Sequence, residues 1–300
     1  MLKMPQSVFR LASGVARAWP LSGLRQGPAC VGVMTCVRNE VACVAFAVGS
    51  LVNHVDYYVL IDTGSDDGTV ELIRDLYQAE IRSGRLVIEE IGLLPDYDMS
   101  IARNRALTLL RAAQVEYFIK VDGDTVFYDD GAQQVVGAAK LLDRRITHLR
   151  CPTHELYQFE VEGTAEWLYA LQDRRDVFWE MSFLPEPPLV HAMEGAHAVG
   201  KWGDEQAGLR PEGIAYDRQE KHRTHRGVVA AHYGWARPLR NKREKLAAWK
   251  SPLGEDPRLD QLHLSNDWRR PTARFTRHPE IIGRKADTVI EWLKRQTPHK

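Results

Sequence analysis

The sequence predicts an α/β protein with a Rossmann-like, mostly parallel sheet flanked by helices. Three observations support this fold class. Short apolar runs alternate with segments of helical periodicity, polar residues follow the runs where each would leave the sheet, and 300 residues with 44% hydrophobic content are enough for a large core. Ligands of such sheets bind outside the carboxyl ends of the strands, so the polar residues at these points are the first candidates for a functional site.

The expected elements follow the changes in hydrophobic period along the chain. The first half has predicted strands at residues 31–36, 57–61, 85–89 and 117–121, with helices ending near residue 52 and at 69–80 and 101–113. The second half has a predicted helix at 132–142 and a closing helix at 286–295. Strands at 147–151 and 156–161 show an alternating pattern typical of antiparallel pairs, and we expect them to extend the parallel sheet.

Composition limits the class of function. Forty basic and forty acidic residues give a formal net charge of zero, so no global field attracts nucleic acid. The four cysteines form no Cys-x-x-Cys pair, which favours free thiols in a reducing compartment. No apolar stretch reaches the roughly 20 residues of a membrane span, and no secretory signal is evident. The expected location is the cytoplasm.

The N-terminal segment, residues 1–29, carries four basic residues and no acidic one. Apolar residues at helical spacing favour a short amphipathic helix. Such a helix would lie on the inner face of an anionic membrane. The alternative, which we favour, is an arm that packs on the body or frays.

Two carboxylates, Asp122 and Asp124, follow the buried strand at residues 117–121. Carboxylate oxygens are the ligands that hard divalent cations prefer, so this pair is a candidate metal site. The alternative is a solvated Asp-Gly turn.

The octapeptide at residues 62–69 (DTGSDDGT) follows the second strand, as Asn39 and Glu40 follow the first. From the end of its strand, Asp62 is placed to accept a hydrogen bond from a nucleobase imide or a ribose hydroxyl, and the alternative is a capped turn without a ligand. Its neighbours Asp66, Asp67 and Thr69 are candidate caps of the next helix. Arg103 begins a later helix, where it would bind a diphosphate or form a structural salt bridge.

Four motifs in order resemble glycosyltransferase family 2, the inverting nucleotide-sugar transferases of GT-A fold. They are Asn39-Glu40, residues 62–69, Ala102-Arg103-Asn104 and Asp122-Gly123-Asp124. The resemblance covers residues 30–130 well and the remainder weakly. It implies that Asp62 reads the base, that Arg103 lies beside the nucleotide, and that the Asp-x-Asp pair binds ribose and Mn²⁺ or Mg²⁺. One departure is the end of the first strand at residues 34–38, where family members often have a proline.

The resemblance also implies further site residues. The catalytic base is expected at Asp204 or Glu205, with Glu194 in reserve, and His232 is expected to complete the metal shell. The residues expected to bind the donor are Thr35, Asn39, Glu40, Asp62, Ser65, Arg103 and Asp122. The expected domains are an N-terminal extension (1–29), a GT-A domain (30–250, with a nucleotide-binding half at 30–130 and an acceptor half at 131–250), and a C-terminal tail or lid with a helix (251–300).

The expected function is metal-assisted transfer of a sugar, with inversion, from a nucleoside-diphosphate sugar to an acceptor hydroxyl. A UDP-sugar is favoured as donor, and the acceptor is a glycan, a lipid-linked glycan or a protein. A nucleotidyltransferase of similar fold is one alternative, although residues 37–40 contain none of the glycines that such an enzyme has after its first strand. A non-catalytic glycan-binding protein on the same scaffold is the other, and the intact pair Asp122 and Asp124 disfavours it.

Overall fold

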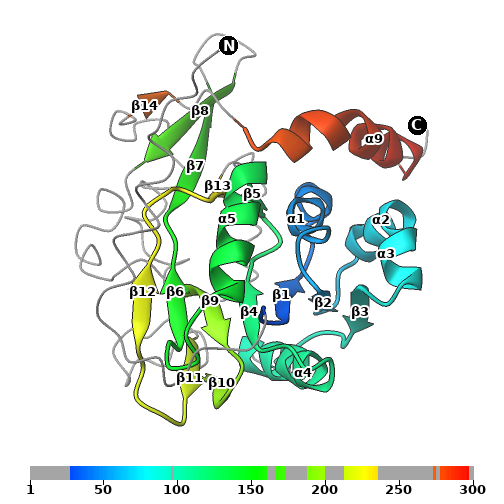
Figure 1. Cartoon of the computed structure of the whole chain (residues 1–300). Coiled ribbons are helices and arrows are strands. Elements are labelled where there is room, and N and C mark those ends of the chain that lie inside the picture. Colours follow the sequence, from blue (N-terminus) through cyan, green and yellow to red (C-terminus); the bar gives the residue numbers. More distant parts are fainter. Residues whose placement is uncertain are drawn as a thin grey trace, which may run out of the picture.

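A computed structural model of the chain describes residues 28–95, 98–160, 167–172, 188–199, 213–235, 273–274 and 278–296. Its central feature is a seven-stranded sheet of order β12-β6-β9-β4-β1-β2-β3 (Figure 1). One half of this sheet is parallel. It consists of β1 (Val31–Val37), β2 (Tyr57–Asp62), β3 (Leu86–Glu90) and β4 (Tyr117–Lys120).

The other half of the sheet contains one reversed strand. It is formed by β6 (His148–Arg150), β9 (Pro188–Ala192) and β12 (His222–Thr224), of which β9 is antiparallel to both β4 and β6. The predicted strand at residues 147–151 therefore does extend the sheet.

The predicted strand at residues 156–161 does not extend this sheet. It corresponds to β7 (Thr153–Glu160), which belongs to a separate sheet of order β14-β8-β7-β13-β5. Pro152 lies between β6 and β7 and has no N–H to continue the ladder, which accounts for the change of sheet. The remaining strands are β5 (Thr125–Phe127), β8 (Trp167–Gln172), β13 (Ala230–Trp235), β14 (Ala273–Arg274) and the antiparallel pair β10 (Ala196–Val199) and β11 (Gly213–Tyr216).

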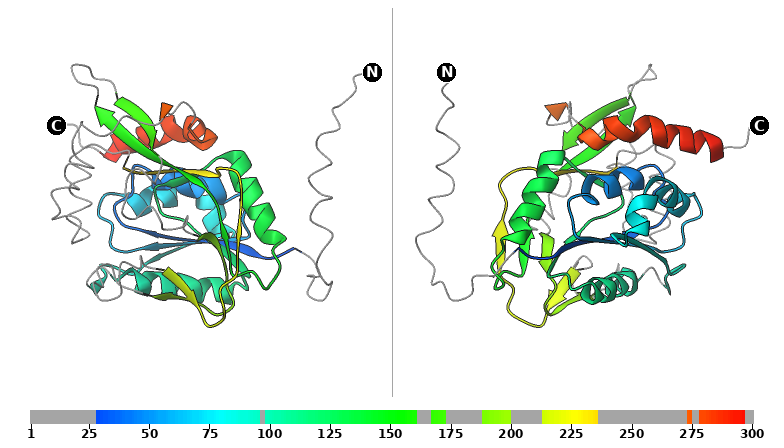
Figure 2. Two further views of the ribbon diagram at one scale, coloured as in Figure 1. Left: turned by 90° about the vertical axis from the view of Figure 1, so that its left-hand side faces the viewer. Right: turned by 45° about the vertical axis from the view of Figure 1, so that its right-hand side comes forward.

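Helices cover both faces of the large sheet (Figure 2). One face packs against α1 (Val44–Leu51), α2 (Thr69–Leu76), α3 (Gln78–Arg82) and α5 (Asp129–Lys140), and the other against α4 (Met99–Ala112). The period of two along β2 explains the division, because Tyr58 and Leu60 enter the first core while Val59 and Ile61 enter the second. A last helix, α9 (Glu280–Gln296), packs over α1. The predicted α/β class, with the mostly parallel sheet between helices expected of a GT-A-type fold, is confirmed.

The predicted helix at residues 69–80 is interrupted. It divides into α2 and α3 at Tyr77, whose φ of −122° leaves the helical region. The ring of Tyr77 is only 3% exposed, and its hydroxyl donates to the carbonyl of Ala45 on α1. Periodicity along one segment does not register such a contact, because the partner belongs to another helix.

No helix among the described residues is both long and apolar enough to cross a membrane. Residues 1–27 lie outside the described part of the chain, so the interfacial helix and the packed arm both remain predictions.

Two glycines of α5 give a matched test of the packing beside β13. A Cβ at Gly131 would lie 2.7 Å from the Cα of Val229 and closer still to its carbonyl oxygen, whereas a Cβ at Gly137 would meet nothing within 4 Å. We expect Gly131→Ala to destabilise by about 2 kcal/mol or more, because backbone cannot yield as a side chain does. Gly137→Ala should stabilise by about 0.5–1 kcal/mol through helix propensity. Urea unfolding measures both, and equal effects of the two substitutions would contradict this packing.

A row of rings crosses the sheet on the α4 face. Phe118 of β4, His191 of β9, His148 of β6 and His222 of β12 occupy successive paired positions. The rings of Phe118 and His191 stack at 5.2 Å between centroids, and those of His148 and His222 at 5.5 Å. Burial, together with Arg150 and His222, lowers the pKa of His148 from its ordinary 6.5 to about 4.

This shift predicts a pH dependence of stability. Between pH 6.5 and pH 4 the unfolded chain protonates His148 and the folded protein does not, so stability falls as the pH falls. Below about pH 4 both states carry the proton, and the loss levels off. Between pH 7 and pH 5, we expect the free energy of unfolding of the wild type to fall by about 1–2 kcal/mol more than that of the variant His148→Asn. Urea unfolding at the two pH values measures it, and parallel declines would refute the prediction.

Candidate functional site

Two loops at the carboxyl edge of the parallel strands are joined by hydrogen bonds. The β1–α1 loop contains Asn39, whose φ is +55° and whose side chain pairs reciprocally with Asp66 of the β2–α2 loop, at 2.9 Å for each bond. The next backbone N–H groups continue the pairing, because Glu40 donates to Thr69 Oγ1 at 2.9 Å and Val41 donates to Asp67 Oδ2 at 3.1 Å. The loops are thus preorganised as one wall.

Asp62 determines the shape of the second loop. Its carboxylate, at the end of β2, accepts the N–H of Gly64 at 2.9 Å and the N–H of Ser65 at 3.0 Å, and it also accepts the Ser65 hydroxyl. Ser65 in turn accepts the N–H of Asn39 at 2.9 Å. Asp62 is 2% exposed. Recognition of a base by Asp62 remains a prediction, and these contacts fix the backbone that would surround the base.

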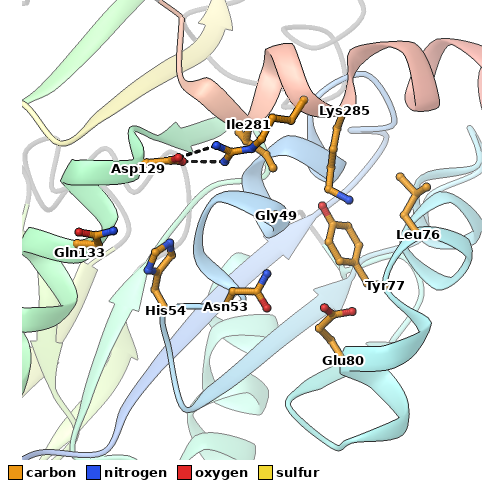
Figure 3. A pocket seen from close by; sticks show the side chains of 11 residues that line it. Gly49, Asn53, His54, Leu76, Tyr77, Glu80, Asp129, Gln133, Ile281 and Lys285 are labelled. Carbon is orange, nitrogen blue, oxygen red and sulfur yellow. Dashed lines mark hydrogen bonds and ion pairs between the residues drawn. The ribbon is translucent and has the colours of Figure 1, made fainter.

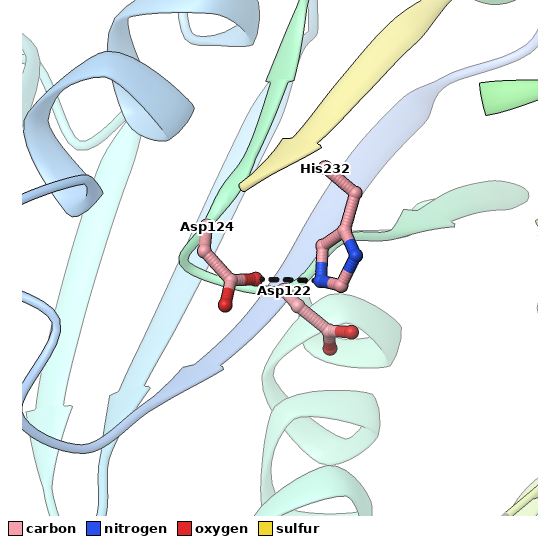
Figure 4. A group of neighbouring side chains, drawn as sticks. All are labelled: Asp122, Asp124 and His232. Atoms are coloured by element: carbon pink, nitrogen blue, oxygen red, sulfur yellow. Dashed lines mark ion pairs between the residues drawn. The ribbon is translucent and has the colours of Figure 1, made fainter. Parts of the chain in front are cut away.

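The predicted metal ligands come together at the same edge (Figure 4). Asp122, Asp124 and His232 each offer one ligand atom, and these atoms all lie within 4.8 Å of one another. His232 Nε2 is 3.1 Å from Asp124 Oδ1. Asp124 is buried, Asp122 is exposed, and His232 lies between these extremes. The cluster is therefore buried on the side of Asp124 and open to solvent on the side of Asp122.

Strand pairing explains why His232 joins residues so distant in sequence. β5 begins directly after Asp124 and pairs antiparallel with β13, with Thr125 opposite His232. The next residue, Tyr233, donates its N–H to the carbonyl of Asp124 at 2.8 Å. The backbone thus fixes the position of His232 relative to the Asp-x-Asp turn.

The residues present fit a divalent cation of the Mn²⁺ or Mg²⁺ type. Carboxylate oxygens suit both ions, and one imidazole nitrogen is better suited to Mn²⁺ than to Mg²⁺. Three protein ligands would leave coordination positions for the oxygens of a diphosphate.

Glu40 lies beside this cluster, and Arg103 lies on α4. A Cβ at Gly123, between the two aspartates, would lie 2.7 Å from Val37 Cγ1 and 3.2 Å from Glu40 Cγ, so any larger residue here would push against both side chains. Arg103 is 8% exposed in the first half of α4, whose N-terminus Asp98 caps by accepting the N–H of Ser100 at 3.1 Å. The predicted donor residues Asn39, Glu40, Asp62 and Ser65 therefore share one edge of the sheet with the cluster.

Two predicted site residues lie elsewhere. The hydroxyl of Thr35 is fully buried in the core and hydrogen-bonds to the hydroxyl of Tyr58 at 2.9 Å, because this position of β1 faces α1. Glu194 follows β9, which runs antiparallel to β4, and so lies at the amino end of β4, where it pairs with Arg218 at 2.9 Å. The fold therefore does not bring Glu194 to the cluster. Asp204 and Glu205 lie outside the described residues.

Asn104 has a structural partner that the sequence did not reveal. Its amide donates to the carbonyl of Ala198 at 3.1 Å and accepts the N–H of Ala198 at 3.0 Å, which fastens β10 to α4. The predicted cap is not formed by the side chain of any of the three candidates, because the N-cap of α2 is Gly68; Asp67 accepts the N–H of Thr69 at 3.0 Å, and Asp66, Asp67 and Thr69 all bond to the β1–α1 loop. No local pattern signals these contacts, because each partner is far away in the sequence.

A pocket of about 410 Å³ lies away from the cluster, between α1, α3, α5 and α9 (Figure 3). Three of its charged side chains have partners within the protein. Arg284 pairs with Asp129, and Lys285 lies over the ring of Tyr77 at 4.8 Å from the centroid. We assign no ligand to it.

Among solved structures, the chain is similar to TarS 1-349 from S. aureus, with 12% identity, 77% of this chain and 68% of that chain covered, and a TM-score of 0.44. The structure of TarS 1-349 in complex with UDP is 12% identical to this chain, with a TM-score of 0.44. The match covers 90% of this chain and 93% of that chain. The chain is also similar to glucosyl-3-phosphoglycerate synthase from Mycobacterium tuberculosis, solved in complex with Mn²⁺, UDP and glucosyl-3-phosphoglycerate. The identity is 15%, the match covers 75% of this chain and 81% of that chain, and the TM-score is 0.42.

A comparison with curated protein sequences found no match. The family model described as glycosyl transferase family 2 matches residues 32–183, which is just over half of the chain and includes the two joined loops, Arg103 and the Asp-x-Asp pair. The chain therefore belongs to glycosyl transferase family 2.

Proposed function

We propose that this protein transfers a sugar from a nucleoside-diphosphate sugar, with UDP favoured, to an acceptor hydroxyl, with metal assistance and with inversion. The observation that carries the proposal is the convergence of Asp122, Asp124 and His232 at the carboxyl edge of the sheet. The joined loops at the same edge add a wall suited to a nucleotide.

In this proposal the residues divide the work of binding the donor. Asp62 and the β2–α2 loop bind the base, and Arg103 lies beside the diphosphate. Asp122, Asp124 and His232 hold the cation, which when bound neutralises the charge of the departing nucleoside diphosphate as a Lewis acid. Fixed ligands supply this stabilisation without reorganisation at the moment of reaction.

The acceptor needs a general base. Asp204 or Glu205 would remove the proton of the acceptor hydroxyl as its oxygen attacks the anomeric carbon opposite the leaving group. In-line attack inverts the anomeric centre. The acceptor is a glycan, a lipid-linked glycan or a protein side chain in this proposal.

A panel of nucleotide sugars, each with and without Mn²⁺, tests the proposal. A cognate donor at 100 times its Kd should stabilise the folded protein by about 2.7 kcal/mol. We expect this stabilisation, and slow hydrolysis of the donor to nucleoside diphosphate, to require the metal. Hydrolysis separates an enzyme from a non-catalytic binding protein, and release of pyrophosphate from a sugar phosphate and UTP would identify a nucleotidyltransferase. Indifference of every donor to metal would defeat the proposal.

A further inference from the structure

The C-terminal helix α9 follows the segment that the family model matches, which ends at residue 183, and it lies across α1 and α2 (Figures 1 and 2). Trp292 of this helix is 7% exposed. Its indole N–H donates to Asp75 Oδ2 on α2 at 2.7 Å. The far edge of the ring lies over the end of the β2–α2 loop, where a Cβ at Gly68 would be 2.9 Å from Trp292 Cη2.

Gly68 lies at the end of the β2–α2 loop, between two residues that bond to the β1–α1 loop. Its φ of +90° is a conformation that glycine adopts readily, but only as one of several. Its neighbours Asp67 and Thr69 are the residues that accept the N–H groups of Val41 and Glu40. A change at Gly68 would therefore move two of the bonds that join the loops.

The contacts continue to the acidic cluster. Thr69 holds the backbone of Glu40, and the side chain of Glu40 packs at Gly123 between Asp122 and Asp124. A continuous line of packed and hydrogen-bonded groups thus runs from α9 to the predicted metal ligands.

We propose that Trp292 is a positioning residue of the donor site, which holds Gly68 in its left-handed conformation and thereby keeps the two loops joined. The inference rests on the proposed function. Covering Gly68 with a rigid ring removes the alternatives that an uncovered glycine would sample. The bond to Asp75 fixes the orientation of that ring. The family match does not include this helix, so the support comes from a part of the chain beyond the matched motifs.

The same helix supplies a matched control. Arg284 binds Asp129 through two bonds of 2.6 Å and 2.8 Å and so attaches α9 to the start of α5, beside the pocket of Figure 3. Loss of either Arg284 or Trp292 weakens the docking of α9. Only Trp292 contacts the β2–α2 loop through Gly68.

The experiment compares Trp292→Ala, Trp292→Phe and Arg284→Ala in the full chain. Amide hydrogen exchange at residues 39–41 and 64–69, without donor, measures the joining of the loops. Steady-state kinetics with UDP-sugar and Mn²⁺ measure the consequence. We expect Trp292→Ala to accelerate exchange at both loops and to raise the donor KM by about 3- to 30-fold, with kcat at saturating donor and the acceptor KM unchanged. Trp292→Phe keeps an aromatic ring but loses the bond to Asp75 and the outer ring atoms that meet Gly68, so its exchange rates and donor KM should lie between those of the wild type and of Trp292→Ala.

Arg284→Ala should lower the thermal midpoint while leaving loop exchange and donor KM near the wild-type values. Equal effects of Trp292→Ala and Arg284→Ala on exchange and KM would overturn the inference, as would unchanged exchange in Trp292→Ala. Faster loop exchange in Trp292→Ala alone would support the coupling between Trp292 and the joined loops. If no UDP-sugar stabilised the same protein, the proposed function would be refuted while this coupling stood. Should the alanine variant fail to fold, Trp292→Leu provides the same comparison, because it keeps an apolar side chain without the ring.

Discussion

The variant Asp124→Ala is expected to lose the metal-dependent stabilisation by UDP-sugar and at least about 100-fold in kcat/KM, because a cation at this site supplies several kcal/mol to the departing diphosphate. Asp124 is the buried member of the cluster, and His232 lies 3.1 Å from it. Removal of its carboxylate therefore takes away the ligand with the most fixed position. Differential scanning fluorimetry with and without Mn²⁺, followed by transfer kinetics, measures both losses.

Two controls make this result specific. Asp124→Asn keeps the shape of the side chain and removes its charge, so it separates metal binding from packing in a position that is 2% exposed. Asp217→Ala changes an aspartate whose side chain is 80% exposed, and it should keep the metal-dependent shift. Full retention of the shift in Asp124→Asn and Asp124→Ala would mean that the cation, if required, binds elsewhere.

The second large effect concerns the catalytic base. We expect Asp204→Asn or Glu205→Gln to lower the rate of transfer by about 10²- to 10⁴-fold, the usual contribution of a positioned general base. Donor affinity and its dependence on metal should remain, because the base acts on the acceptor hydroxyl. Isothermal titration with the UDP-sugar, paired with transfer kinetics, separates the two effects.

Glu194→Gln serves as the comparison for the base. Glu194 lies at the amino end of β4 and pairs with Arg218, whereas the acidic cluster lies beyond the carboxyl end of the same strand. We therefore expect this variant to transfer at close to the wild-type rate. Loss of donor binding in both Asp204→Asn and Glu205→Gln would instead place these two residues in the donor site, and a large loss of transfer in Glu194→Gln would restore it as the base.

Short-range patterns correctly predicted many of the strands and strand ends within residues 30–130. The strands β1 to β4 occur within one or two residues of the predicted runs, because a buried parallel strand needs a continuous apolar segment and ends where polar residues begin. The same ends supplied the candidates Asn39, Asp62 and Asp122. Pairing β1 with β2 and with β4 then brought these three strand ends to one edge.

Other features depended on contacts between distant segments. The position of His232 beside Asp124 follows from the pairing of β13 with β5, and that of Glu194 from the reversal of β9. The family resemblance implied Thr35 as a donor residue, but the side of β1 on which it lies places its hydroxyl against that of Tyr58. A period of two indicates alternation along a strand, and it does not say which face meets the ligand.

The sequence by itself determined the fold class, the strand ends and the Asp-x-Asp pair, because each depends on residues adjacent along the chain. Only the tertiary structure decided that the two loops are hydrogen-bonded to each other and that Trp292 packs on Gly68. It also fixed the position of His232 beside Asp124, a residue that the family resemblance had implied as a metal ligand. These contacts join residues brought together by strand pairing and helix packing, and no local preference encodes the partner on the other side.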